Sequence, residues 1–170
     1  KIFAKSPTLQ VPDELDYVRY DINGAGESIY QQSQEVVRDV IRIGRAGLLV
    51  DFPTTNGEVS RADILNGKVF ATITRYDARD IINWRTERVG SKVKPVLVVL
   101  KSTRPETEPD GYTLKDKDIR IELALEEGVY VQREWCQNEQ LEWHIDSEVF
   151  PRDGSGALLD YIPFVFIGSE

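Results

Sequence analysis

The most regular pattern in the chain is the run Ile119-Arg120-Ile121-Glu122-Leu123-Ala124-Leu125-Glu126, in which apolar side chains recur at every second position. This period of two is typical of a strand with one buried and one solvated face. Gly128 predicts a turn after the run, residues 129–131 continue the alternation, and residues 141–145 repeat it in a third strand. The pattern therefore predicts an antiparallel β-meander with one wet face.

Further β-like stretches lie on both sides of this meander. Residues 81–88 and 93–101 are separated by a turn that contains a glycine, which predicts a hairpin. Residues 102–113 contain two prolines, a glycine and several acids, and predict an exposed loop. The other expected strands are short and lie at 16–22, 47–52, 68–76 and 161–167.

The clearest helix is predicted over residues 28–44. Its apolar residues recur at helical spacing and form one stripe: Ile29, Val36, Val37, Val40, Ile41 and Gly44. Ser28 is a good N-terminal cap, and glycine at position 44 is a good terminator. On the opposite face we expect the solvated ion pairs Glu35–Arg38 and Asp39–Arg42.

These elements predict an α+β fold, with one long amphipathic helix packed on a mostly antiparallel, hairpin-rich sheet. We expect residues 1–170 to form a single domain or a segment of a larger chain. Within it, residues 1–101 form the part that contains the helix, and residues 114–168 form the meander part. The sequence contains no methionine and begins with Lys1, which favours a segment of a longer protein.

Composition narrows the possible functions. The chain has 21 Lys and Arg against 29 Asp and Glu, a formal net charge of −8, and residues 134–170 hold eight of the acids and one base. Such a chain is a poor general nucleic-acid binder, since that affinity needs cations that neutralise phosphates. No apolar run approaches the roughly 18 residues of a membrane span, so we expect a soluble protein with no membrane partner.

A weak nucleotide-binding pattern precedes and follows the helix. Gly24 and Gly26 stand before it, and Asp51 ends the strand after it, in the order that a dinucleotide fold requires. However, Ile29 takes the third glycine position, the preceding stretch is too charged for a central parallel strand, and the later chain consists of hairpins. A flexible turn that leads into a helix is the preferred interpretation.

The remaining candidates for chemistry are few. Cys136 and His144 are the only residues of their types, and a thiol nucleophile would need both together with an orienting group. We expect instead a half-buried thiol and a solvated imidazole. One cysteine excludes an internal disulfide, and one cysteine with one histidine cannot supply a usual zinc ligand set. We expect no metal ion and no cofactor.

Acidic and basic clusters have a simpler explanation as solvated surface. The acids Glu106, Glu108, Asp110, Asp116 and Asp118 lack the spacing of a calcium loop, so we expect exposed loops. The helix arginines Arg38, Arg42 and Arg45 alternate with acids, which favours ion pairs over a phosphate site. The tryptophans Trp84, Trp135 and Trp143 lie in expected strands, with core packing as their default role and interface contact as the second.

Three segments in combination carry a resemblance to a known family. They are Gly44-Arg45-Ala46-Gly47-Leu48-Leu49-Val50-Asp51-Phe52-Pro53, Asp80-Ile81-Ile82-Asn83-Trp84-Arg85 and Tyr161-Ile162-Pro163-Phe164-Val165-Phe166-Ile167-Gly168. In this order and spacing the chain resembles, over most of its length, a domain family of tailed bacteriophages and prophages that is assigned to portal-like proteins. The residues that carry the resemblance are Gly44, Gly47, Asp51, Pro53, Asn83, Trp84, Arg85, Pro163 and Gly168.

The resemblance implies a structural role without catalytic residues. A portal, or head–tail connector, is a ring of identical subunits, usually twelve, at one vertex of the capsid. DNA passes through it during packaging and ejection, and the packaging motor that docks on it hydrolyses the ATP. The chain would belong to the outer wing of such a subunit, which contacts head and tail proteins in the virion and assembles in the host cytoplasm. Two alternatives are another virion adaptor or decoration domain and an enzyme that binds a nucleotide through Gly24, Gly26 and Asp51.

Overall fold

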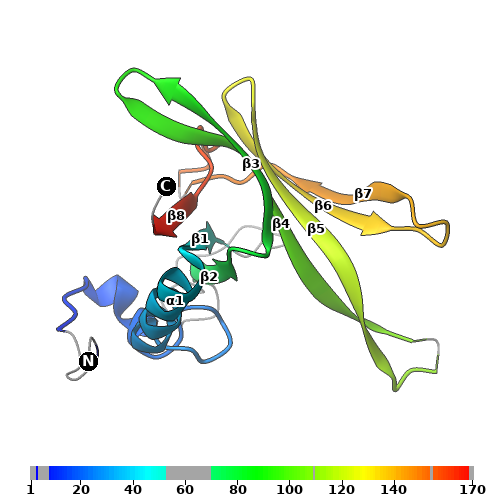
Figure 1. Cartoon of the computed structure of the whole chain (residues 1–170), viewed down its shortest axis with the longest axis horizontal. Helices are drawn as coiled ribbons and strands as arrows, with labels where there is room; N and C mark the ends of the chain where they lie inside the picture. Colours follow the sequence, from blue (N-terminus) through cyan, green and yellow to red (C-terminus); the bar gives the residue numbers. More distant parts are fainter. Residues whose placement is uncertain (1–2, 4–7, 53–69, 109, 154, 169–170) are drawn as a thin grey trace. The chain divides into compact units, whose positions relative to one another are not determined.

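The computed structural model describes residue 3 and residues 8–52, 70–108, 110–153 and 155–168. The chain forms two compact units, residues 1–78 with 163–170 and residues 79–162. Each unit contains one antiparallel sheet, with three strands in the first and five in the second (Figure 1). The fold is α+β, with two sheets where one was expected. The 102–113 segment, the expected boundary between two parts, lies inside the second unit.

The first unit is built from the N-terminal residues and the last strand of the chain. Its elements are the 3₁₀ helix η1 (Asp13–Arg19), the helix α1 (Ile29–Ile43), and the strands β1 (Arg45–Asp51), β2 (Thr72–Asp77) and β8 (Phe164–Gly168). The strands lie in the order β2-β1-β8, and α1 contacts all three (Figure 1). None of the helices in the described residues is both long and apolar enough to cross a membrane.

The ends of α1 follow from local sequence. Ser28 Oγ accepts a hydrogen bond from the Gln31 N–H at 3.2 Å, and Gln31 Oε1 accepts one from the Ser28 N–H at 2.9 Å, which completes a capping box. At the other end Gly44 adopts a φ of +91° and its N–H donates to the Val40 carbonyl at 2.9 Å. Both predicted ends of the helix are confirmed.

The face of α1 that packs inward differs from the predicted stripe. Ile41 is 69% exposed, whereas Gln32 and Asp39 are buried beside Val36. The predicted Glu35–Arg38 ion pair is present at 2.5 Å. The predicted Asp39–Arg42 pair was wrong, because Asp39 points inward and pairs with Arg75 of β2. Polar side chains can face inward here because β2 supplies partners: Gln32 Nε2 also donates to the Ile73 carbonyl at 2.7 Å.

The second unit contains the predicted meander, extended by one hairpin. Its strands pair in sequence order: β3 (Ile81–Val89), β4 (Lys92–Thr107), β5 (Leu114–Glu126), β6 (Val129–Gln137) and β7 (Trp143–Val149). The alternation at 119–125 predicted the buried face of β5, where Leu123 lies with Leu100 of β4 and is almost fully buried. Its predicted continuation through residues 129 and 131 was wrong, because β6 turns the almost fully buried Tyr130 to that face instead. The opposite face is wet only in part, since Ala124 and Val131 on that face are buried as well.

Two short segments depart from the sequence-based expectation. Residues 102–107 continue β4 although Pro105 lies among them; β3 pairs with β4 only as far as Leu100, so no strand needs the missing proline N–H on that side. Residues 16–22 form no strand, because 13–19 fold as η1 with acids in its first turn and an Asp16–Arg19 ion pair at 2.5 Å. Most of the expected strand at 68–76 is present as β2, and Pro53 lies outside the described residues.

Candidate functional site

The first and last segments of the family resemblance lie side by side. Strand β1 pairs with β8 in antiparallel register from Arg45 opposite Gly168 to Leu49 opposite Phe164. The Val50 N–H donates to the Pro163 carbonyl at 2.9 Å and extends the pairing by one step. Two segments that are more than a hundred residues apart in sequence are therefore neighbouring strands of the three-stranded sheet.

A glycine is needed at the end of this pairing. Gly168 has a φ of +124°, and a Cβ built on it would stand 2.2 Å from the Gly44 carbonyl oxygen and 3.1 Å from the Arg45 Cα. Any side chain at residue 168 would therefore push two backbones apart. The residues that carry the resemblance at the end of the helix and at the end of β8 thus meet in one close backbone contact.

The other residues that carry the resemblance are spread over the fold. Gly47 is buried in the middle of β1 between Tyr76 and Phe166, and Asp51 ends the same strand. Asn83, Trp84 and Arg85 lie in β3 of the second unit, all with exposed side chains. The structure therefore joins two of the three segments in one sheet and places the third in the other sheet.

The glycine-rich loop before α1 uses its own backbone donors. The Ala25 and Glu27 N–H groups donate to Asn23 Oδ1 at 2.9 and 3.3 Å, and the Gly26 N–H donates to Asp21 Oδ1 at 3.0 Å. The loop does lie near Asp51, because Gly24 approaches Thr72, the register partner of Asp51. The amide oxygen of Asn23 and the carboxylate of Asp21 therefore occupy the N–H groups that a bound phosphate would need. Every described strand pairing is also antiparallel.

Cys136 and His144 are register partners on the neighbouring strands β6 and β7. Cys136 is completely buried, more than expected, whereas His144 is exposed. Burial raises the pKa of the Cys136 thiol, and the nearby carboxylate of Asp146 raises it further. A thiol nucleophile needs the opposite shift, toward thiolate, so this arrangement disfavours a catalytic pair.

Beside the thiol, one arginine binds two acids. Arg104 Nη1 donates to Glu134 and, at 3.0 Å, to Asp146, while Nη2 lies 3.8 Å from Cys136 Sγ. The ligand atoms of Glu134, Cys136 and Asp146 lie within 4.8 Å of one another, a spacing that suits a metal ion. The Arg104 guanidinium already supplies the positive charge at this point, and hydrogen bonding to Asp146 raises its pKa. The cluster is therefore explained as an ion-pair network.

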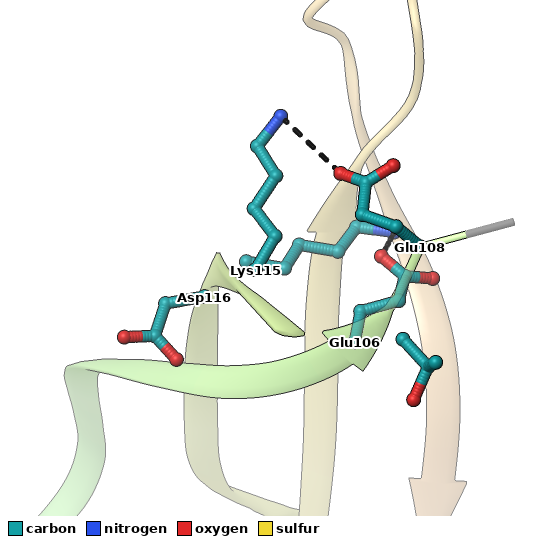
Figure 2. Close-up of a pocket in the computed structure, with 6 residues that line it drawn as sticks. Glu106, Glu108, Lys115 and Asp116 are labelled. Carbon is teal, nitrogen blue, oxygen red and sulfur yellow. Dashed lines mark ion pairs between the residues drawn. The ribbon is translucent and has the colours of Figure 1, made fainter. Parts of the chain in front are cut away.

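The acids of the 102–113 segment and its neighbours line a shallow pocket on the β4–β5 hairpin. Figure 2 shows Glu106, Glu108, Lys115 and Asp116 around it. Lys115 and Lys117 reach Glu108 and Glu106 at 4.0 and 3.6 Å. Such exposed pairs contribute little energy, and the alternation of charge gives the pocket no preference for one ligand. These acids were expected in exposed loops; Glu106 and Asp116 are exposed, but they lie on the strands β4 and β5.

The face of the five-stranded sheet opposite to its buried face holds a larger hollow, of about 480 Å³, which we call the tryptophan hollow. It is lined by Ile82, Asn83, Val99, Arg120, Glu122, Trp135 and Trp143. The Arg120 guanidinium lies 4.0 Å from the centre of the Trp143 ring, and Trp135 Nε1 donates to Glu122 at 3.1 Å. Two tryptophans that the sequence assigned to core packing thus line an open surface.

A second arginine network borders this hollow and was not foreseen. Arg133 of β6 donates to Glu122 at 2.9 Å, to Glu126 at 2.7 Å and to Glu148 of β7 at 2.5 Å. Hydrogen bonds to Glu126 and Glu148 raise the pKa of Arg133, and those from Arg133 lower the pKa of Glu126. The only sequence signal was one arginine at a polar position of an alternating strand, which does not reveal its partners.

No family model matches this chain, and a search of the curated proteins finds no match. The geometry of the described residues consequently stands as the main evidence on function. It includes two saturated arginine–carboxylate networks, a buried thiol and an open hollow lined with aromatic side chains.

Proposed function

We propose that this chain is a structural domain of a phage portal (head–tail connector) protein, part of a ring through which DNA is packaged and ejected. The observation on which this proposal rests is the pairing of β1, which lies in segment 44–53 of the family resemblance, with β8, which lies in segment 161–168. They are closed at one end by the contact of Gly168 with Gly44. Segments matched so far apart in sequence are thereby parts of one folded unit, which supports a resemblance in fold.

The chemistry of the described side chains agrees with a role without catalysis. The thiol of Cys136 is buried, with its pKa raised by that burial. Arg104 and Arg133 are each held by two or more carboxylates. No buried side-chain nitrogen or oxygen in the described residues lacks a hydrogen-bond partner. Groups that are satisfied in this way stabilise a scaffold and leave little driving force for proton or group transfer.

The charge of the chain fits a protein that guides DNA without holding it. The net charge is −8, so the domain as a whole repels the phosphate backbone. Within the proposal, the domain lies in the outer wing of the subunit and contacts its own copies around a ring, of twelve subunits in the full-length protein. It also meets packaging-motor, head and tail proteins. Its place is the capsid vertex of the virion and, during assembly, the host cytoplasm.

Electron microscopy of the full-length protein that contains this chain tests the proposal. We expect closed rings with a central channel, and in the genome a neighbouring gene for a large terminase subunit. Particles that never close into rings would contradict the proposal. Rings or virion binding without the terminase neighbour would favour the adaptor or decoration alternative. Thermal stabilisation by a nucleotide would instead favour the Gly24–Asp51 alternative.

A further inference from the structure

Strands β4 and β5 extend well beyond their neighbours. β3 pairs with β4 only as far as Leu100, and β6 pairs with β5 only from Ile119 onward. Residues 102–108 and 110–118, which we call the arm, are therefore paired through their backbones only with each other, although the Arg104 side chain bonds to Glu134 and Asp146. The arm runs past the rest of the five-stranded sheet in Figure 1. A ribbon of two strands is marginally stable in water, so a projecting arm calls for a contact that justifies it.

At the tip of the arm, residues 110–113 form a hydrogen-bonded turn next to exposed apolar groups. Asp110 Oδ1 accepts the N–H groups of Tyr112 and Thr113 at 2.9 and 2.8 Å, and Thr113 Oγ1 donates to Asp110 Oδ2 at 2.5 Å. The turn holds Tyr112 at 93% exposure and Leu114 at 68%. Asp110 gives this aromatic tip a negative charge, whereas the charge of Glu108 is matched by Lys115 at 4.0 Å. Rigid tyrosines of this kind are frequent contact residues in interfaces.

The tryptophan hollow has the complementary character. Its lining combines two tryptophans and the aliphatic residues Ile82 and Val99 with polar and charged side chains, and Ile82 is 44% exposed. Lys101 of β4 stands directly opposite Arg120 of β5, and both side chains are exposed. Like charges in directly opposed positions destabilise a sheet. Within the part of the chain that the structure describes, neither has a carboxylate partner, and Arg120 stacks on Trp143. A partner that brings an acid and an aromatic ring would offset the two opposed positive charges and pack against the exposed tryptophans.

The arm of the same molecule cannot be that partner. Arg120 lies in the hollow and Leu114 next to the tip, on one continuous strand. Six residues of extended strand span about 20 Å, so the tip of β5 is held away from the hollow that β5 helps to line. A second copy of the chain can supply the tip without this restriction.

We propose that the tip of the arm of one copy, with Tyr112 at its centre, docks in the tryptophan hollow of a second copy. Asp110 would then face Lys101 and Arg120 across the contact. The surfaces differ, so the contact is head-to-tail and can repeat from copy to copy, as a closed ring requires. The inference that this contact builds a ring rests on the proposed function, whereas the contact itself can be tested separately.

Cysteine cross-linking tests the contact directly. Both variants, Tyr112→Cys and Ile82→Cys, are made in a Cys136→Ala background, and circular dichroism verifies that each is folded. When the two are mixed under oxidising conditions, we expect a disulfide-linked heterodimer. A chain that carries both substitutions should give a ladder of dimers, trimers and larger species, because a head-to-tail contact repeats. Tyr20→Cys, which replaces a tyrosine 72% exposed in the other unit, is the matched control and should not link to Ile82→Cys.

Sedimentation velocity supplies a second measurement without cross-linking. Tyr112→Ala is expected to weaken self-association by about tenfold or more, whereas Tyr20→Ala should leave it unchanged. A wild-type chain that stays monomeric, or a Tyr112→Cys chain that links only to itself while folded, would overturn the docking. Rings of the full-length protein without the 112–82 cross-link would refute this contact and leave the proposed function standing. A ladder of cross-linked species without rings of the full-length protein would support this contact and contradict the proposed function.

Discussion

Gly168 shows how much one missing side chain can matter. Its φ of +124° and the 2.2 Å between a Cβ at this position and the Gly44 carbonyl oxygen leave no room for alanine. We expect Gly168→Ala to lower the free energy of unfolding by about 2–3 kcal/mol, measured by chemical denaturation. Gly156→Ala is the control: its φ is +86° but its surroundings are open, so only the backbone cost of about 1 kcal/mol remains. Equal losses of unfolding free energy in the two variants would show that the close approach of residue 168 to Gly44 adds no cost beyond that of the backbone conformation.

The thiol of Cys136 gives a prediction about pH. Burial raises its pKa, so the folded chain binds the thiol proton more tightly than the unfolded chain. The stabilisation from this group is complete below the ordinary thiol pKa of about 8.5 and is lost as the pH rises through the raised value. We expect a smaller alkaline loss of stability in Cys136→Ala than in the wild type. We also expect a thiol reagent to label the protein only after denaturation; rapid labelling of the folded chain would contradict the burial.

At the scale of elements, the ion pair between Asp39 and Arg75 joins α1 to β2. The Asp39 side chain is 9% exposed and that of Arg75 is 29% exposed, so removal of one partner leaves a poorly solvated charge. We expect Asp39→Ala to lower the free energy of unfolding by about 2–3 kcal/mol. Glu35→Ala removes an exposed pair on the same helix and should cost about 0.5 kcal/mol or less. Thermal unfolding of the two variants compares them, and similar melting temperatures would refute the inward role of Asp39.

The elements that were predicted well are those whose signals are local. Ser28 and Gly44 end α1 through bonds within a few residues of themselves, and the alternation at 119–126 predicted β5. Residues 102–107 were assigned wrongly because their state depends on a distant neighbour. Residues 16–22 were assigned wrongly although the contacts that form η1 are local. Pro105 is compatible with a strand only because β3 ends its pairing with β4 at Leu100, so no neighbouring strand needs an N–H group from Pro105. A local sequence pattern cannot indicate where a neighbouring strand ends.

For the whole molecule, the net charge of −8 leads to a prediction about DNA. An acidic domain cannot release enough counterions to bind duplex DNA by charge. We therefore expect no shift of duplex DNA in an electrophoretic mobility assay at physiological salt, even at high protein concentration. A basic DNA-binding protein of similar size is the positive control. Retention of DNA by the chain would contradict a conduit that lets its cargo slide.

The sequence by itself determined the α+β class, the helix with both of its ends, and the antiparallel meander, because periodicity, caps and turns act over a few residues. Only the tertiary structure decided that β8 returns to β1, that Asp39 turns inward to Arg75, and that tryptophans line an open hollow. These outcomes depend on which surfaces meet across long separations in the chain. The physical reason is that a side chain's partner, and therefore its burial and charge state, is a property of the packed fold and not of its neighbours in sequence.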